Sequence, residues 1–244
     1  MSQILDLVIA SRTLAEHGVI DAYGHASLRS ASNPQRYLMS RSIPPELITE
    51  ADIMEFDLDS KPIDAQGRMM YNERFIHGEI YKARPDVQAI VHNHSPSVVP
   101  YSCAGRELRP IFHMSALIGL GVPNWDIRDV QEGSDLLVRT PYLGEALARR
   151  LGAHPAALMR GHGAVVVGEN MQRAVGRSIY LEMNARMQFQ ATVLAGSDGR
   201  IVFMDDKEVA ANVSWQNYER SWQLWKTRAL ATLERERNSN SPRA

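Results

Sequence analysis

Two histidines separated by one residue follow a run of apolar residues in the first half of the chain. The stretch reads VQAIVHNHS, and it predicts a strand over residues 87–95 that carries His92 and His94. Because alternate residues of a strand point to one face, the two imidazoles should project together, with Asn93 turned away. Such a pair alone is weak evidence of a metal site, because histidines also face solvent or pack in cores, so a third ligand is needed.

A third histidine, His162, lies between two glycines in the stretch MRGHGAVVVG. The apolar residues on both sides predict a hairpin over 156–170 with this histidine at its tip. Gly161 and Gly163 would let the backbone approach another element closely, although turns favour glycine in any case. Three neutral imidazoles with an open coordination position are typical of a catalytic metal site. Zn²⁺ is the first expectation, and Mn²⁺, Co²⁺ or Fe²⁺ also accept imidazole.

A glutamate opens the helix that leads into the His-x-His strand. Glu73 begins the helical pattern over 73–86. A carboxylate at a helix start is stabilised as an anion, so Glu73 has a purely structural explanation as well. Beside a metal it becomes the candidate proton carrier. His77, one turn later, is expected to pack or to support the site, and three histidines lie outside any constellation: His17, His113 and His154.

The composition indicates one soluble globular domain. The chain has 244 residues, 44% hydrophobic and 23% charged, and a net charge of −1, so no basic surface is expected to attract nucleic acid. No apolar stretch approaches the ~18 residues of a membrane span. The single cysteine, Cys103, excludes an internal disulfide framework and suits a reducing cytosol. The start MSQILDLVIASRTLAEHG lacks a basic segment, so a cytoplasmic protein is expected.

Helical and strand patterns intermix without strict alternation. This mixture favours an α/β layered domain with a mainly antiparallel or mixed sheet. The domain is expected to span residues 1–235, with a polar tail at 236–244. Beyond the elements named above, helices are expected at 3–17, within 95–105 and 134–152, and at 170–195 and 217–235, and strands at 26–30, 36–40 and 53–59.

The motifs together resemble the class II aldolase/adducin family. The resemblance rests on NERFIHGEIYKARPDVQAIVHNHSPSVV and on the later MRGHGAVVVGENMQRAV, and it runs from the first helix to about residue 195. It implies that His92, His94 and His162 are metal ligands and that Glu73 is the acid/base. It also implies a three-layer fold, with a central mainly antiparallel sheet flanked by helices. A homo-oligomer is implied too, with a tetramer favoured and active sites at subunit interfaces.

Three stretches depart from the sugar-phosphate members of that family. Those members bind phosphate through a GN-x-S turn, a small Thr/Ser-Gly turn and two serines before the glutamate. Here YGHAS places His25, MSRSIPP places Arg41 and MYNER places Tyr71 at the matching positions. Each change alone is explained by surface or packing roles. A guanidinium matches a planar carboxylate, so together the three changes favour a carboxylated, possibly planar substrate bound by these residues.

The pattern GHAS, LMSRS, ERFIHGEIY, HNHSPSV and MRGHG is similar to the decarboxylase branch of the family. That branch acts on hydroxy-carboxy-muconic semialdehydes or dihydroxyphthalate-like acids in aromatic compound degradation. The resemblance therefore implies a metal-dependent carboxy-lyase that breaks a C–C bond, leaves an enolate and releases CO₂. Glu73 would return a proton to the carbanion carbon, which suits a carboxyl group with a raised pKa.

Two other functions remain open. The first is a class II aldolase that cleaves a non-phosphorylated hydroxy-oxo acid with the same metal and glutamate. The second is a non-catalytic adducin-like binding module, which predicts that ligands would be missing, whereas all three histidines and Glu73 are present.

Aromatic residues recur near the end of the chain. Tyr218, Trp222 and Trp225 have the spacing of one helical face. Packing in the core or at a subunit interface is the favoured interpretation. The alternative is a lid over a planar substrate, contributed by the same or a neighbouring subunit, with Tyr218 as the substrate-binding member.

Overall fold

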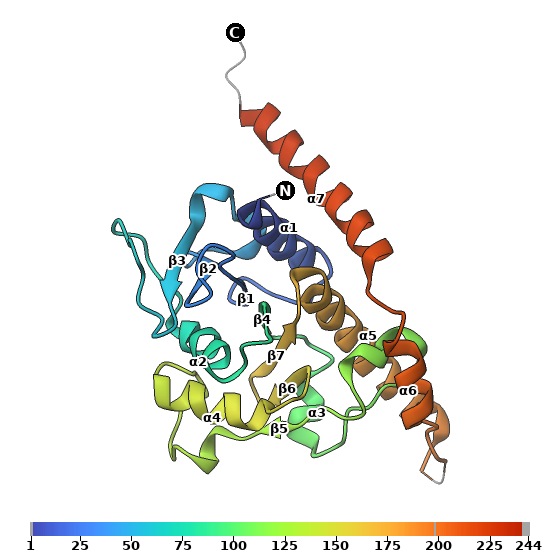
Figure 1. Cartoon of the computed structure of the whole chain (residues 1–244). Helices are drawn as coiled ribbons and strands as arrows, with labels where there is room; N and C mark the ends of the chain where they lie inside the picture. Colours follow the sequence, from blue (N-terminus) through green and yellow to red (C-terminus); the bar gives the residue numbers. More distant parts are fainter. Residues whose placement is uncertain (1, 198, 241–244) are drawn as a thin grey trace.

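A seven-stranded sheet forms the centre of the molecule (Figure 1). The computed structural model describes residues 2–197 and 199–240. The strand order is β3-β2-β1-β4-β7-β6-β5, and every neighbouring pair is antiparallel except β5–β6. The expected α/β fold with a mainly antiparallel sheet is confirmed. The strands are β1 His25–Arg29, β2 Arg36–Ser40, β3 Ile53–Asp57, β4 Ala89–Asn93, β5 Asn124–Trp125, β6 Ala156–Met159 and β7 Gly163–Gly168.

The described part of the chain contains seven α-helices, and most lie where the sequence predicts them. Two short elements were not predicted. Strand β5 has only two residues, and α6 is a polar helix that begins with a capping box between Asp205 and Glu208. The helices are α1 Gln3–Glu16, α2 Phe75–Ala83, α3 Val99–Ala104, α4 Pro141–Leu151, α5 Met171–Ala195, α6 Asp206–Val213 and α7 Glu219–Asn240.

Short 3-10 turns complete the chain, and one of them carries the predicted proton carrier. Glu73 belongs to the turn Asn72–Arg74, just before α2, and not to the α-helix itself. The other turns are Pro45–Leu47, Glu50–Asp52, His113–Ile118 and Ile127–Asp129.

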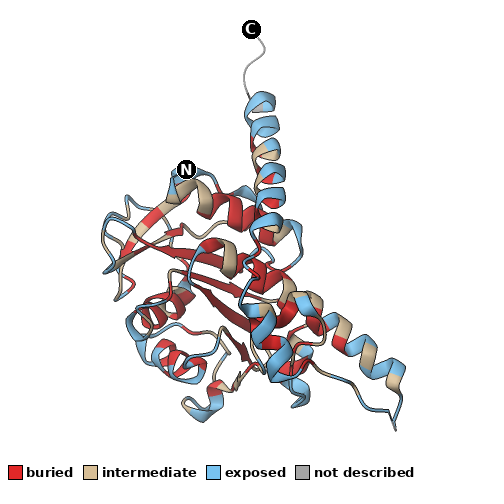
Figure 2. Ribbon diagram, turned by 45° about the vertical axis from the view of Figure 1, so that its right-hand side comes forward, coloured by how far each residue is buried: buried red, intermediate tan, exposed pale blue. Residues whose placement is uncertain are grey.

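Helices cover both faces of the sheet, which gives the three expected layers. Strand residues alternate between the two sides. On β4, Ile90 joins the apolar cluster under α2 and α4, whereas Ala89 and Val91 join the cluster under α1 and α5. Figure 2 shows buried residues along the strands and on the inner sides of these helices. Strand β4 is therefore enclosed on both faces, and its end is a place where polar side chains can be sheltered from water.

The register of three strands sets where the histidines meet. His25 on β1 pairs with His92 on β4, and Asn93 at the end of β4 pairs with Ala164 on β7. The hairpin of β6 and β7 therefore brings its turn beside the end of β4. A Cβ atom at Gly163 would lie 1.9 Å from the Asn93 carbonyl oxygen, so only glycine permits this approach. The expected role of Gly163 in close backbone contact is confirmed.

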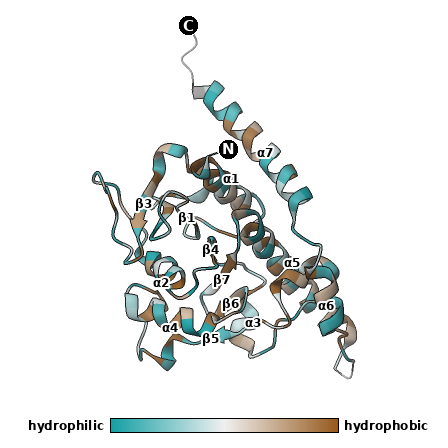
Figure 3. Cartoon of the chain, viewed as in Figure 1, coloured by the Kyte–Doolittle hydropathy of each residue, from teal (hydrophilic) through white to brown (hydrophobic). Residues whose placement is uncertain are grey.

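Helix α7 lies against α1 and α5 and extends beyond the rest of the molecule (Figure 1). It is largely hydrophilic (Figure 3), but Trp222 and Trp225 are buried in the cluster under α1 and α5. The helix continues into the expected tail as far as Asn240. Within that tail Glu236 binds buried Arg12 at 2.8 Å. Residues 241–244 of that tail lie outside the described residues, and the domain boundary at 235 stays a prediction.

Tyr218 is not on the α7 face where the spacing placed it. It precedes the helix with φ +59°, and its hydroxyl donates to the Met114 carbonyl at 2.9 Å. Its ring stacks on Tyr180 with centroids 5.1 Å apart. The helical-face prediction is therefore wrong for Tyr218, because the chain turns before the helix starts.

Among the described helices, none has the length and apolar character that a membrane span requires.

We expect Gly176→Ala to test how tightly Tyr218 packs. An added Cβ atom would lie 2.1 Å from Tyr218 Cδ2, so the variant should lower the free energy of unfolding by about 1–3 kcal/mol. In a Tyr218→Ala background the same change should be neutral or stabilising by up to about 1 kcal/mol, because alanine favours helix. Denaturant unfolding measures both. Equal losses in the two backgrounds would show that the ring does not lie on α5.

Candidate metal and substrate site

The four residues predicted to form the metal centre lie together. One ligand atom from each of Glu73, His92, His94 and His162 falls within 4.8 Å of the others. The Glu73 Oε2 atom lies 3.6 Å from His92 Nε2 and 3.4 Å from His162 Nε2. Residues from the turn before α2, from β4 and from the β6–β7 turn thus converge on one point. This is the only such group among the described residues.

Each of the three imidazoles is fixed through its Nδ1 atom. His92 Nδ1 lies 3.2 Å from the Ala164 carbonyl, and His162 Nδ1 lies 2.8 Å from the Leu136 carbonyl. His94 Nδ1 lies 3.0 Å from the Asp21 carboxylate. A carbonyl or carboxylate oxygen only accepts, so each Nδ1 carries the hydrogen and each Nε2 keeps a lone pair.

The Nε2 atoms make the group suitable for a cation. All three are buried and make no hydrogen bond. Buried polar atoms without partners are rare in folded proteins unless a water or ion serves them. Three lone pairs beside a carboxylate therefore fit a divalent metal ion, held as metal-binding histidines are usually held, through an oriented second nitrogen.

Burial favours the neutral form of His92, whereas the imidazoles around Glu73 favour its charged form. Burial lowers the pKa of His92 to about 4, although the Glu73 carboxylate partly offsets it. Burial alone would raise the pKa of Glu73, but the nearby imidazoles of His162 and His92 outweigh it and hold this pKa well below its usual value. The expectation that Glu73 has a raised pKa is therefore wrong for the protein alone, because the imidazoles face its carboxylate.

One loop holds two of the four residues through its backbone. The Val138 N–H donates to Glu73 Oε1 at 2.8 Å, and the Leu136 carbonyl accepts from His162. Leu136 has φ +71°, a conformation that leucine rarely adopts. This loop, which precedes α4, therefore contacts the metal centre through backbone atoms. Such contacts cannot be predicted from the types of the side chains.

Of the four predicted substrate residues, His25 and Tyr71 lie beside the cluster and Arg41 lies near Tyr71. The His25 ring is 5.1 Å from that of His92 and 4.6 Å from that of Tyr71. Burial raises the pKa of Tyr71, and the charge of Arg41 offsets part of this rise. Arg41 Nε donates to Asp52 at 2.6 Å, which leaves the other end of the guanidinium for a ligand.

The two tyrosines predicted to bind substrate differ in position. Tyr71 lies in the site, but its hydroxyl donates to the Ile43 carbonyl at 2.6 Å, so its ring is the part available beside His25. Tyr218 contacts Met114 and Tyr180, not the four clustered residues. A role of Tyr218 toward substrate stays a prediction.

Sequence reasoning missed two supporting side chains, Asp21 and Ser27. Asp21 orients His94 and also accepts from the Tyr23 and Gly24 backbone N–H groups. His77, which was expected to pack or to support the site, hydrogen-bonds His25 at 2.7 Å. Ser27 lies beyond His77. The alternation of His25 and Ser27 along a strand was a usable signal, whereas nothing in the sequence marks Asp21.

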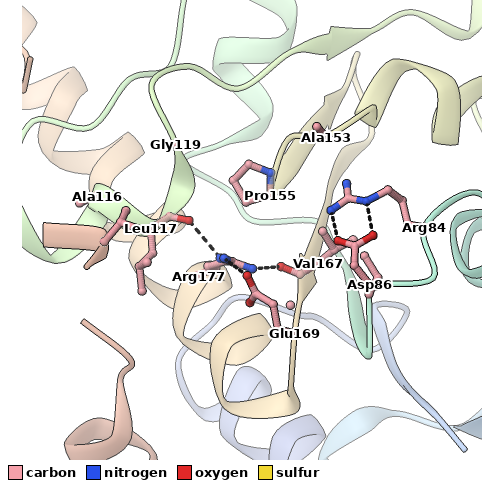
Figure 4. A pocket seen from close by; sticks show the side chains of 13 residues that line it. Arg84, Asp86, Ala116, Leu117, Gly119, Ala153, Pro155, Val167, Glu169 and Arg177 are labelled. Atoms are coloured by element: carbon pink, nitrogen blue, oxygen red, sulfur yellow. Dashed lines mark hydrogen bonds and ion pairs between the residues drawn. The ribbon is translucent and has the colours of Figure 1, made fainter. Parts of the chain in front are cut away.

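A separate hollow of about 220 Å³ lies at the opposite end of β7 (Figure 4). Its charged groups are paired with one another: Arg84 binds Asp86, and Arg177 binds Glu169 and the carbonyls of Leu117 and Val167. Both guanidinium groups in this hollow are thus paired with carboxylates of the chain itself.

Comparisons with known proteins find matches that cover most of the chain. Residues 5–189 match the model of the Class II Aldolase and Adducin N-terminal domain. The chain is 36% identical to "Decarboxylase tropJ" of Talaromyces stipitatus, covering 87% of this chain and 88% of that protein. It is 32% identical to the 3,4-dihydroxyphthalate decarboxylase of Arthrobacter keyseri, over 78% and 79%.

A solved structure gives the same fold. The L-fuculose 1-phosphate aldolase from Glaciozyma antarctica superposes with a TM-score of 0.73, at 23% identity, over 97% of this chain and 90% of that one. At this identity the likeness concerns the fold alone.

We expect Asp21→Asn to weaken metal binding by about 10–100-fold, because asparagine keeps an acceptor oxygen for His94 but removes the charge. Competition with a chromophoric chelator measures the affinity for Zn²⁺. Asp59→Asn is the matched control, since Asp59 is exposed and pairs with Lys82. Equal affinities in wild type and Asp21→Asn would contradict the role of Asp21.

The metal-free protein should lose stability as the pH falls. Burial lowers the pKa values of His25, His77 and His92 from 6.5, so the unfolded chain binds protons first. The free energy of unfolding therefore has its full value above about pH 6.5. It declines toward about pH 4, by up to about 1.4 kcal/mol per pH unit for each histidine. Denaturant unfolding in chelator measures the slope. His77→Asn should reduce it and exposed His113→Asn should not; an unchanged slope in His77→Asn would contradict the assignment.

Proposed function

The chain belongs to the class II aldolase and adducin family, and we propose that it is a metal-dependent decarboxylase of a hydroxy- or oxo-substituted carboxylic acid in aromatic compound degradation. The decarboxylase activities named in its relatives support a carbon–carbon lyase. The observation that carries the metal dependence is the convergence of three unpartnered Nε2 atoms beside Glu73.

The metal-binding residues are His92, His94 and His162. Zn²⁺ is the first candidate, with Mn²⁺, Co²⁺ or Fe²⁺ as alternatives, because imidazole suits all four. A divalent ion bound there would supply a Lewis acid that stabilises the negative charge left on the substrate when the C–C bond breaks.

The residues beside the cluster hold the substrate. We assign a substrate carboxylate to Arg41, because the part of its guanidinium that Asp52 does not occupy can form charge-assisted hydrogen bonds. The ring of Tyr71 offers a flat apolar surface next to His25. This arrangement supports a planar acid, and it replaces the hydroxyl groups with which sugar-phosphate members bind phosphate.

Glu73 moves the proton. In decarboxylation the bond from carbon to the carboxylate breaks, CO₂ leaves, and the electron pair stays on carbon until a proton arrives. Because Glu73 is ionised in the protein alone, it must first take a proton, from a substrate hydroxyl or from water, and then deliver it to that carbon. The Val138 N–H contact at 2.8 Å fixes one carboxylate oxygen and leaves the other facing the cluster.

Two alternatives make different predictions. A class II aldolase acting on a non-phosphorylated hydroxy-oxo acid would use the same groups but release an aldehyde. An adducin-like binding module needs no ligands, and the presence of all four clustered residues disfavours it. We further propose a cytoplasmic homo-oligomer, a tetramer by family resemblance, in which Tyr218 could serve a neighbouring subunit's site.

Glu73→Gln should lower the rate of CO₂ release by about 10²–10⁴-fold while metal content is retained, because the amide cannot transfer the proton. The assay uses metal-loaded protein with hydroxy-carboxy-muconic and dihydroxybenzene-dicarboxylic acids. Glu145→Gln is the control, since Glu145 is exposed on α4.

Unchanged turnover with metal bound would contradict the role of Glu73. Aldehyde release without CO₂ would favour the aldolase. A protein that binds no metal would remove both enzyme functions and favour the binding module.

A further inference from the structure

Four buried side chains form a line of hydrogen bonds that ends beside the metal centre. His25 Nδ1 lies 2.7 Å from His77 Nε2, and His77 Nδ1 lies 2.6 Å from Ser27 Oγ. Ser27 Oγ lies 2.9 Å from the Tyr81 hydroxyl, which has a long 3.5 Å contact to the Gln88 carbonyl. None of the four side chains is more than 2% exposed. We name this line the histidine relay.

Strand and helix geometry together produce the relay. His25 and Ser27 are alternate residues of β1 and therefore face the same layer. His77 and Tyr81 are four residues apart on α2, so they share the face of that helix. The helix covers this side of the sheet, and the two pairs interlock.

The far end of the relay sets the direction of every hydrogen bond in it. The Gln88 carbonyl can only accept, so the Tyr81 hydroxyl donates to it. Ser27 then donates to the Tyr81 oxygen and accepts from His77 Nδ1–H. His77 Nε2 consequently accepts from His25 Nδ1–H, and His25 Nε2 is left with a lone pair.

A second argument gives the same direction. His25 Nε2 is buried and has no partner. The reverse direction would place a hydrogen on this atom, and a buried N–H group without an acceptor is the rarer and costlier arrangement. Both neutral rings therefore carry their hydrogen on Nδ1.

This nitrogen borders the metal centre without belonging to it. The His25 ring lies beside His92 and Tyr71, but His25 is not one of the four residues whose ligand atoms cluster. Its lone pair therefore adjoins the place where the substrate must lie, and it lacks a hydrogen-bond donor there.

We propose that His25 Nε2 accepts a hydrogen bond from a hydroxyl group of the substrate, and that the histidine relay makes the site select hydroxylated carboxylic acids. The proposal rests on the proposed function for its carboxylate. A carboxylate has no hydrogen to donate, so it binds Arg41 and not His25, and the two residues together recognise an acid with a neighbouring hydroxyl. His77, Ser27 and Tyr81 are positioning residues that act through His25.

Magnetic resonance of protein labelled at histidine nitrogens tests the direction without any reaction. Two-bond nitrogen–hydrogen correlations distinguish the two tautomers, and His25→Asn assigns the signals. Hydrogen on Nδ1 of both His25 and His77 is expected, and hydrogen on Nε2 of His25 would overturn the proposal. Tyr81→Phe removes the acceptor for Ser27 and should shift His25 toward the opposite tautomer. No shift would show that the relay does not set the direction.

Ligand binding tests the selectivity. We would titrate zinc-loaded protein with salicylate and with its methyl ether, o-anisate, which cannot donate a hydrogen bond. His25→Leu should reduce the preference for salicylate by about tenfold, since such a bond contributes about 1.4 kcal/mol. Both ligands carry the same carboxylate, so its contribution to binding persists in the variant and cancels from the comparison. His113→Leu, at an exposed histidine, is the control.

An undiminished preference in His25→Leu, with zinc content intact, would overturn the proposal. Neither measurement depends on CO₂ release. A protein that shows the expected tautomers and selectivity but releases no CO₂ would contradict the proposed function alone. A protein that releases CO₂ but lacks the expected tautomers or selectivity would contradict only the role of His25.

Discussion

Three oxygen atoms, each accepting the Nδ1 hydrogen of one histidine, make the contacts on which the rest of the site depends. They come from Ala164, Leu136 and Asp21. By fixing the tautomers they leave three buried lone pairs unpaired, at a cost of order 1–3 kcal/mol each. The apolar layers on both faces of β4 must supply stability to offset that cost. A bound cation would remove it, so metal binding and folding stability are linked.

The same three contacts join distant parts of the chain. Asp21 follows the first helix, Ala164 is the second residue of β7, and Leu136 lies in the loop before α4. The metal centre is thus a property of the whole fold and not of a local motif, although His92 and His94 are only two residues apart.

The sequence was informative where side-chain type and short spacing decide the structure. The i, i+2 spacing of His92 and His94 and the glycines around His162 predicted which residues would meet, and the apolar patterns predicted the sheet type. It was uninformative where backbone atoms act, as at Leu136 and Val138. It misled at Tyr218, which lies before α7 in a left-handed backbone conformation and so does not share the helix face. It also misled at Glu73, whose pKa depends on neighbours from other elements.

The loop before α4 has a further consequence for how such a site can change over generations. It orients His162 and Glu73 only through the carbonyl of Leu136 and the N–H of Val138. Substitutions at an exposed position of this loop such as Glu132 alter the surroundings of the centre without removing those two backbone contacts. The residues that a substrate meets can therefore diverge between related proteins while His162 and Glu73 keep their positions.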